Sequence, residues 1–353
     1  MKSTAANPFA TRLAAFAARL RERRLSAAIV CGEANIRALT AVPCDNACLV
    51  VRPGKAPVFL TDFRYVPMVH RLAPWLTVGD LRTLGRLRVG DRVGFEASVS
   101  YARYRRLKGV FPRSRLVDVE AELSALRSVK TADEIAKLSA AEALNDRIWA
   151  LSRKRFRAGM TEREMARIIR HLMIELGDGE AFETIVCVGK NAAECHHVPD
   201  GTVWNGREGV LVDLGVKLDG YCSDMTRNIV PARPSRLYRR VYGLVREANR
   251  LAVAAARPGI TAGELDAVAR DFLREHGFGE AFGHSLGHGV GLEIHEAPTA
   301  RKGDRTVLKP GMLVTIEPGV YLEDNLGVRI EDLVVITETG CRVLSSSPVA
   351  SLP

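Results

Sequence analysis

Two stretches of twenty residues in this chain resemble each other and lie 100 positions apart. AGMTEREMARIIRHLMIELG (158–177) and PGITAGELDAVARDFLREHG (258–277) align without gaps, and each has a Thr-x-x-Glu capping box before an apolar helical pattern. A glycine closes each copy, so each predicts a helix with defined ends, and capping alone accounts for part of the likeness. Strand-like runs follow both copies, at 181–188 and 210–215 after the first and at 312–316 and 328–336 after the second. This order favours two similar halves arranged around one site.

The residues before this repeat predict a separate domain of alternating strands and helices. A chain of 353 residues exceeds the usual size of one domain. In its first third, short apolar runs alternate with helical patterns, at 27–30, 47–51, 58–60 and 92–95. A long helix is expected over 128–156, where Thr131 and Glu134 can form a capping box. We therefore predict an α/β domain over 1–127, a linker helix over 128–156 and a second domain over 157–353.

Charge and cysteine content exclude several classes of protein. Residues 1–125 hold 21 Lys and Arg against 10 Asp and Glu, whereas the remainder holds 30 against 31. Because these basic residues are dispersed and lack interleaved aromatic residues, nucleic-acid binding is not expected. The seven cysteines form no CxxC pair, which argues against a disulfide framework or a zinc knuckle and favours the cytoplasm. No run of eighteen uncharged apolar residues occurs, so no membrane partner is expected.

Two acidic residues lie on apolar strands that are expected to pair. In GVLVDLGVKLDGYCSDMTRNIV (209–230), Asp213 lies on one strand and Asp224 on the next, with Asp219 and Gly220 in the turn between them. A hairpin would bring both carboxylates to one face, either opposite each other or one diagonal apart. Asp213 lies among apolar residues, where an unpaired carboxylate is costly to bury. A role as a metal ligand is therefore favoured for Asp213 over a role as an acidic residue of the turn.

Glu317 and Glu331 lie in similar surroundings near the C-terminus. Glu317 ends the apolar run MLVTI, and Glu331 lies within GVRIEDLVVI. Four carboxylates that converge in an apolar cleft repel each other unless cations neutralise them. His288 offers a nitrogen ligand, so the set predicts a carboxylate-rich centre for divalent metal.

The segments that carry these residues resemble a known family. VDLGVKLDGYCSDMTRN, HSLGHGVGLEIHEAP, TIEPGVY and GVRIED look like the four metal-site blocks of the pita-bread metallopeptidases, which include aminopeptidase P and prolidase. EANIRALTAV, PVFLTDFRY and LRSVKTADEIAKL are similar to that family's N-terminal domain and linker. The implied fold is α/β (α+β), with an N-terminal creatinase-like α/β domain followed by a C-terminal pita-bread domain that has a pseudo-twofold internal repeat.

The resemblance also implies the composition of the active site. Two divalent metal ions per subunit are expected, with Mn²⁺ preferred over Co²⁺ or Zn²⁺. Their ligands fall on Asp213, Asp224, His288, Glu317 and Glu331. The family's other active-site residues fall on His196, His284, His295 and Arg329. Of these, Arg329 would orient Glu331 and Asp224 through charge-assisted hydrogen bonds.

The implied reaction is metal-assisted hydrolysis of a peptide bond. Glu317 would act as general base and pass a proton to the leaving nitrogen. His284 and His295 would stabilise the oxyanion of the tetrahedral intermediate. His196 would close over the substrate from its loop.

The loop that carries His196 departs from the family pattern. In VCVGKNAAECHHVPDG (186–201), Cys195 occupies a position where proline is common, and Val188 precedes the glycine. Loop rigidity or substrate preference could therefore differ. A cysteine nucleophile at Cys195 is disfavoured, because no oxyanion motif or orienting Asn is evident.

The implied substrates are Xaa-Pro dipeptides or short peptides with proline second, cleaved before the proline by a homodimer. Proline has no N–H and a fixed φ, so proteases that bind an extended, hydrogen-bonded strand cannot hold this bond productively. Two alternatives are another C–N hydrolase on the same fold, of the creatinase kind, and a non-catalytic pita-bread protein that binds a peptide or partner. All five expected ligands are present, which disfavours both.

Overall fold

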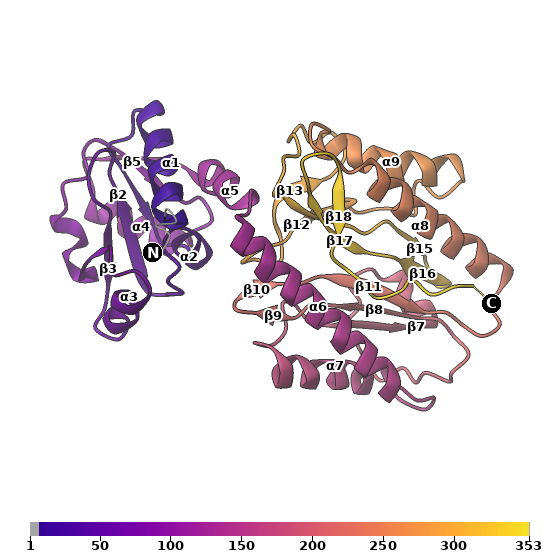
Figure 1. Ribbon diagram of the computed structural model, residues 1–353. Helices are drawn as coiled ribbons and strands as arrows, with labels where there is room; N and C mark the ends of the chain where they lie inside the picture. Colours follow the sequence, from indigo (N-terminus) through magenta and orange to yellow (C-terminus); the bar gives the residue numbers. More distant parts are fainter. Residues whose placement is uncertain (1–6, 353) are drawn as a thin grey trace, which may run out of the picture. The chain divides into compact units, whose positions relative to one another are not determined.

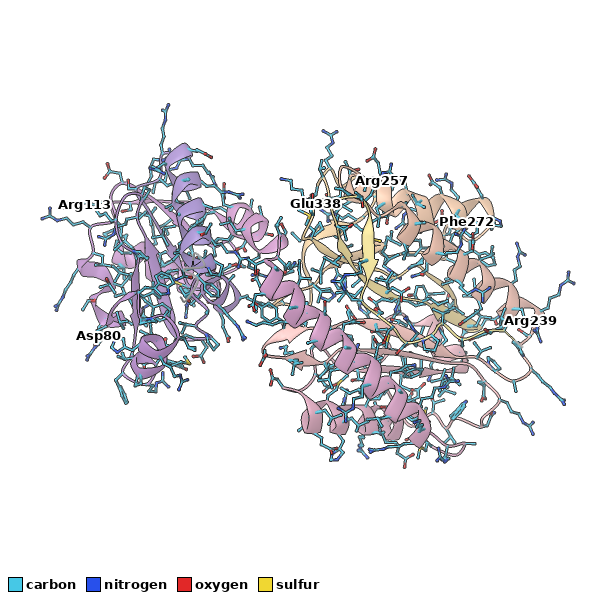
Figure 2. All side chains as sticks on the ribbon, in the orientation of Figure 1. Asp80, Arg113, Arg239, Arg257, Phe272 and Glu338 are labelled. Carbon is cyan, nitrogen blue, oxygen red and sulfur yellow. The ribbon has the colours of Figure 1, made fainter. Side chains whose placement is uncertain are left out.

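The computed structural model describes residues 7–352. The first six residues of the predicted N-terminal domain and the last residue of the predicted second domain lie outside the described residues. The chain divides into two compact units, Met1–Arg127 and Ser128–Pro353 (Figure 1). Exposed basic side chains such as Arg113, Arg239 and Arg257 project outward from both units (Figure 2).

The first unit is built on one six-stranded sheet with the order β4-β3-β2-β1-β5-β6. Its strands are β1 (Ala27–Val30), β2 (Ala47–Val51), β3 (Val58–Thr61), β4 (Thr77–Asp80), β5 (Arg92–Phe95) and β6 (Arg115–Asp118). Its helices are α1 (Pro8–Glu22), α2 (Glu33–Thr40), α3 (Val66–Leu72), η1 (Leu81–Arg86), α4 (Tyr101–Val110) and α5 (Glu120–Ser128). In β1, Val30 packs with Phe16 of α1 on one face and Ile29 packs with Leu107 of α4 on the other. Both faces are covered, which explains why the apolar run of β1 does not alternate.

The second unit places its strands between helices (Figure 1). Its helices are α6 (Ala132–Arg155), α7 (Glu162–Leu176), η2 (Gly189–Ala193), α8 (Arg236–Ala255) and α9 (Ala262–Glu275). The strands of its first half are β7 (Ile185–Val188), β8 (Val210–Leu214), β9 (Lys217–Leu218), β10 (Tyr221–Cys222) and β11 (Met225–Ile229). The strands of its second half are β12 (Gly287–Gly289), β13 (Glu296–Ala300), β14 (Leu313–Ile316), β15 (Gly319–Leu322), β16 (Leu326–Arg329), β17 (Asp332–Ile336) and β18 (Cys341–Val343).

The sequence repeat corresponds to two structurally similar halves. Helices α7 and α9 each begin with the predicted capping box, and both boxes have both hydrogen bonds. The two capping threonines also make equivalent bridges, Thr161 to Val203 and Thr261 to Val307. Each half contains a three-stranded sheet, with the orders β11-β8-β7 and β14-β17-β18. The prediction of two similar halves is confirmed.

Several predicted elements have different bounds in the structure, among them the strand expected over 181–188, which spans only Ile185–Val188 as β7. The helix expected over 128–156 spans Ala132–Arg155, because Thr131 caps it and Val129 instead forms a bridge with Met312. The strand expected over 328–336 is interrupted, since β16 pairs with β15 whereas β17 pairs with β14. The chain changes strand partner at Ile330 and Glu331, and this interruption contains one of the predicted metal ligands.

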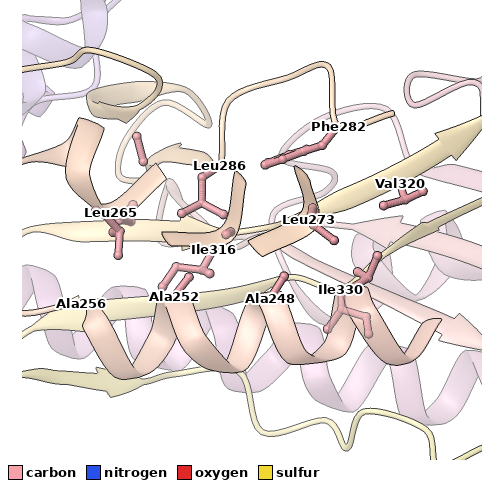
Figure 3. Close-up of a cluster of buried hydrophobic side chains, with 14 of the residues drawn as sticks. Ala248, Ala252, Ala256, Leu265, Leu273, Phe282, Leu286, Ile316, Val320 and Ile330 are labelled. Atoms are coloured by element: carbon pink, nitrogen blue, oxygen red, sulfur yellow. The ribbon is translucent and has the colours of Figure 1, made fainter. Parts of the chain in front are cut away.

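A buried apolar cluster lies beneath the segments that carry the last two acids. Leu265 of α9 packs in this cluster with Ile316 and Ile330 (Figure 3). Each isoleucine immediately precedes a glutamate, Glu317 or Glu331. Burying each isoleucine side chain stabilises the fold by about 1.5–3 kcal/mol. Because adjacent side chains of extended chain point to opposite sides, this burial turns both carboxylates away from the cluster.

Candidate metal centre

Asp213 and Asp224 reach the same face of one antiparallel pair of strands. Thr226 of β11 lies opposite Asp213 of β8, and Asp224 precedes Thr226 by two residues. Side chains alternate along a strand, so Asp224 shares the face of Asp213 and lies one diagonal away, as the sequence predicts. Between these strands, Asp219 and Gly220 form the turn of the β9–β10 hairpin, with φ of 49° and 68°. Positive φ at both positions is typical of a type I′ turn, which explains the Asp-Gly pair.

Two glycines allow β12 to bring His288 into the same site. Gly287 and Gly289 flank His288, and a Cβ at either position would overlap a backbone carbonyl, that of Thr315 or of Ala297 respectively. The neighbouring strands therefore approach β12 more closely than any side chain would permit. Glycine at both positions is a condition for placing the imidazole here.

The ring of His288 directs one nitrogen at carboxylates. Nδ1 lies 3.1 Å from the carbonyl oxygen of Gly289, which only accepts, so Nδ1 carries a proton. Nε2 lies 3.5 Å from Asp224 Oδ2 and 3.3 Å from Glu317 Oε1. Burial lowers the pKa of His288, but the contact with Glu317 outweighs burial and the net pKa is raised. Ligand-type atoms of Asp224, His288 and Glu331 all lie within 4.8 Å of one another.

Two threonines, which sequence analysis missed, hold the glutamates. Thr226 Oγ1 donates to Glu331 Oε2 over 2.7 Å, and Thr315 Oγ1 donates to Glu317 Oε1 over 3.0 Å. Thr226 lies two residues after Asp224, and Thr315 lies two residues before Glu317. Residues two apart on a strand share a face, and that spacing is the signal that could have identified them.

Arg329 is buried and joins several parts of the site. Its Nη2 donates to Asp213 Oδ2 over 2.8 Å, and its Nε donates to Thr226 Oγ1 over 2.9 Å. Its Nη1 donates to Tyr321 Oη over 2.9 Å and to the carbonyl oxygen of Cys195 over 3.3 Å. The rigid fork of the guanidinium makes these contacts in several directions at once.

The partners of Arg329 differ from those that the sequence predicts. The resemblance assigns Arg329 to Glu331 and Asp224, whereas the structure places it on Asp213 and connects it to Glu331 through Thr226. The strand register explains the difference, because Thr226 lies directly opposite Asp213 and Asp224 is one diagonal away. The arginine therefore supports a carboxylate other than those expected.

The carboxylates form a buried cluster whose negative charge is not fully balanced. The pKa of Asp224 is raised well above its usual range by burial and then by Glu331, Asp213 and Glu317. The pKa of Glu331 is raised in the same way by burial and then by Glu317 and Asp213. Burial also raises the pKa of Asp213 although Arg329 opposes it, and Asp213 Oδ1 has no hydrogen-bond partner among residues 7–352. This donor set fits divalent cations, which would supply the missing positive charge.

His284 is connected to Arg329 through Tyr321, which sequence analysis also missed. His284 Nδ1 lies 2.7 Å from the carbonyl oxygen of Ser285, and Nε2 lies 2.8 Å from Tyr321 Oη. Burial lowers the pKa of His284 and raises that of Tyr321, so the imidazole is neutral and the hydroxyl keeps its proton. Because a carbonyl only accepts, Nδ1 donates to Ser285 and Nε2 accepts from Tyr321. Both ring nitrogens of His284 are therefore engaged.

One cavity of about 620 Å³ is lined by all nine predicted site residues. They are His196, Asp213, Asp224, His284, His288, His295, Glu317, Arg329 and Glu331. The rings of His288 and His295 meet edge to face with their centroids 4.3 Å apart. The structure thus brings together residues from the four metal-site blocks and from the loop that carries His196.

Comparison with known proteins identifies the class of this protein. Residues 136–338 match the model of metallopeptidase family M24, and residues 12–129 match that of the creatinase/prolidase N-terminal domain. The chain belongs to the M24 family, and the predicted fold and family are confirmed. Among residues 7–352, no helix combines the length and apolar character needed to cross a bilayer.

Particular relatives bear the names of proline-specific peptidases. An Xaa-Pro dipeptidase from Lactobacillus helveticus is 44% identical over 250 residues, which cover 70% of this chain and 68% of the relative. The prolidase structure from Pyrococcus horikoshii OT3 matches with a TM-score of 0.91 and 30% identity, covering 96% of this chain and 99% of that one. An X-Pro aminopeptidase structure from Thermotoga maritima MSB8 matches with a TM-score of 0.84 and 30% identity, covering 94% and 99% respectively.

Proposed function

We propose that this protein is an Xaa-Pro dipeptidase that uses two divalent metal ions. The observation that carries the proposal is the convergence of five ligand-type side chains in one cavity, where a buried oxygen of Asp213 has no hydrogen-bond partner among the described residues. The residues that would hold the metal are Asp213, Asp224, His288, Glu317 and Glu331. The names of the relatives from Lactobacillus helveticus and Pyrococcus support cleavage before proline.

The residues of this chain suit hydrolysis of an amide. When bound, divalent cations supply Lewis-acid polarisation of the scissile carbonyl and lower the pKa of water. Burial raises the pKa of Glu317, but its contact with His288 outweighs burial and lowers it to about 2, so Glu317 is ionised. It would carry a proton to the leaving proline nitrogen.

The histidines of the cavity would have different tasks. Burial lowers the pKa of His295, and His295 lies at the cavity wall beside His288, so it is the candidate neutral donor to the oxyanion. The resemblance also assigns His284 to the oxyanion, but both its ring nitrogens are engaged, so we propose that it holds Tyr321 and the cavity wall in place instead. His196 lies in the cavity wall and would contact the bound peptide.

A comparison of two substrates tests the proposal. Purified protein supplied with Mn²⁺ is expected to release proline from dipeptides such as Leu-Pro, and to act far more slowly on a matched tripeptide such as Leu-Pro-Gly. Glu317→Gln preserves the shape of the side chain and removes the proton acceptor, so it is expected to lose about 10²-fold or more in kcat. Preferential cleavage of the tripeptide would indicate an aminopeptidase, and turnover of neither peptide by metal-loaded protein would refute the proposal.

Three further features are part of the proposal. Carboxylate and imidazole ligands accept several divalent ions, and we propose Mn²⁺ as the metal in the cell. Elemental analysis of protein purified without added metal would check this choice.

We also propose that the protein is a homodimer, which light scattering would test. We further propose a cytoplasmic location. The seven free cysteines suit this location, because reducing compartments keep thiols unpaired.

A further inference from the structure

A buried glutamate outside the metal centre holds the segment that carries His196. Glu162 lies in the first turn of α7 and has no exposed surface. Its Oε1 accepts hydrogen bonds from the backbone N–H of Val188 over 2.6 Å and from Asn191 Nδ2 over 3.0 Å. Its Oε2 accepts from His197 Nε2 over 2.8 Å and from the backbone N–H of Asp200 over 3.1 Å. One carboxylate therefore contacts the segment at four points between 188 and 200.

His197 lies between two carboxylates. Its Nε2 contacts Glu162, and its Nδ1 lies 3.1 Å from Glu194 Oε2. Carboxylate oxygens only accept hydrogen bonds, so both contacts are satisfied when the ring carries both protons. Burial lowers the pKa of His197, but the hydrogen bonds to Glu162 and Glu194 outweigh burial and the net pKa is raised. Asp200 is the other acidic group of this segment near His197, which contributes to the lowered pKa of Asp200.

The cavity-lining His196 is flanked by two anchored neighbours. On one side, the carbonyl oxygen of Cys195 accepts from Arg329 Nη1 over 3.3 Å. On the other, the ring of His197 is held by the buried Glu162. Consecutive Cα atoms are about 3.8 Å apart, so anchoring both neighbours restricts the backbone of His196 and with it the direction of its Cα–Cβ bond.

We propose that Glu162 and His197 are positioning residues, which clamp the segment 188–200 so that the imidazole of His196 faces the metal-ligand cluster. The clamp acts through His196. The effect of the clamp on catalysis rests on the proposed function. Its effect on the rigidity of the segment 188–200 does not.

The second half of the domain contains a comparable arrangement. Asp266 of α9 is buried, and its Oδ1 accepts from the backbone N–H of Leu286 over 3.0 Å. Arg270 is paired with Asp266 and donates from Nη2 to the carbonyl oxygen of His284 over 2.7 Å. In each half, a buried carboxylate on the helix with the capping box thus anchors a segment that carries a cavity-lining histidine. The two halves use different residues for this purpose, Glu162 with His197 in the first and Asp266 with Arg270 in the second. The shared feature is therefore the position of the buried carboxylate on the helix, and not one particular pair of residue types.

A third metal ion at Glu162, His197 and Asp200 is less well supported. Ligand-type atoms of these residues lie within 4.8 Å of one another. However, each oxygen of Glu162 already accepts two hydrogen bonds, and an ion would have to displace them. The structure therefore favours the clamp over a metal site.

Replacing His197 in two ways tests the clamp. His197→Ala removes the contact with Glu162, so hydrogen exchange of the backbone amides of 189–202 is expected to become about 10-fold faster or more. We expect kcat to fall about 10- to 100-fold while KM changes little, because a misplaced group costs the chemical step most. His197→Gln keeps an N–H donor near the position of Nε2 and is expected to restore most of the slow exchange and of kcat.

His171→Gln provides a matched control on the same helix. His171 is exposed and lies 3.8 Å from Glu175, so its replacement is expected to change neither exchange nor kinetics. Wild-type exchange over 189–202 in His197→Ala would overturn the clamp, and so would fast exchange with wild-type kcat. A metal content that falls by one ion in His197→Gln would indicate the third metal site instead. If the wild-type protein cleaves no Xaa-Pro peptide, the exchange measurement still decides whether the clamp exists.

Discussion

The hydroxyl of Tyr321 lies 2.8 Å from His284 Nε2 and 2.9 Å from Arg329 Nη1. It accepts from the guanidinium and donates to the imidazole, so it couples the residue that supports Asp213 to the wall of the cavity. Tyr321→Phe removes this link without changing the shape of the ring. We expect kcat to fall about 10-fold and the free energy of unfolding to fall by about 2 kcal/mol, as for two hydrogen bonds of about 1 kcal/mol each. Steady-state kinetics and urea unfolding would measure both, and an unchanged kcat would show that the link has no catalytic effect.

Gly287→Ala tests the close approach of strands at His288. The added methyl group would overlap the carbonyl of Thr315, so β12 must move and take His288 with it. We expect weaker metal binding by about 10-fold or more, measured by titration of metal-free protein, because ligand geometry sets affinity. Gly283→Ala is the matched control, since a Cβ there meets no atom within 4 Å. Equal affinity for both variants would contradict the steric argument.

Removal of metal is expected to destabilise the protein. Asp213, Asp224 and Glu331 are buried together, and bound cations would offset their repulsion. Binding to the folded state alone stabilises by about 4 kcal/mol at a ligand concentration of about a thousand times Kd. The thermal midpoint should therefore fall after chelation and recover when Mn²⁺ is added. Identical melting curves with and without metal, at confirmed occupancy, would argue against this centre.

The stability that His197 contributes is expected to depend on pH. Its folded-state pKa is raised above the ordinary value of 6.5, so the protonated ring is favoured in the folded protein. The contribution is then fully present below the unfolded pKa and is lost as the pH rises through the folded pKa. The difference in unfolding free energy between wild type and His197→Gln should be largest in mildly acidic solution and should shrink as the pH rises. A difference that grows with pH would show that the ring is not paired with Glu162 and Glu194.

Features that depend on short stretches of sequence were predicted well. The capping boxes at Thr161 and Thr261 involve residues three apart, and β1 and β2 have the predicted bounds. Asp213, Glu317 and Glu331 were identified because each lies within or at the end of an apolar run, where a carboxylate without a partner is costly. The edge strands β4 and β6 were missed, since they are less buried than the central strands and their sequences lack continuous apolar runs.

Contacts between distant segments could not be predicted from the sequence. Arg329 and Asp213 are 116 residues apart, and their pairing depends on the register of β8 with β11 and on the break between β16 and β17. The contact of Glu162 with His197 likewise depends on how the segment 188–200 folds over the first turn of α7. The sequence by itself determined which residues are costly to bury without a partner. The tertiary structure decided which partner each of them has, because hydrogen bonds and ion pairs are set by distances between atoms that chain order does not specify.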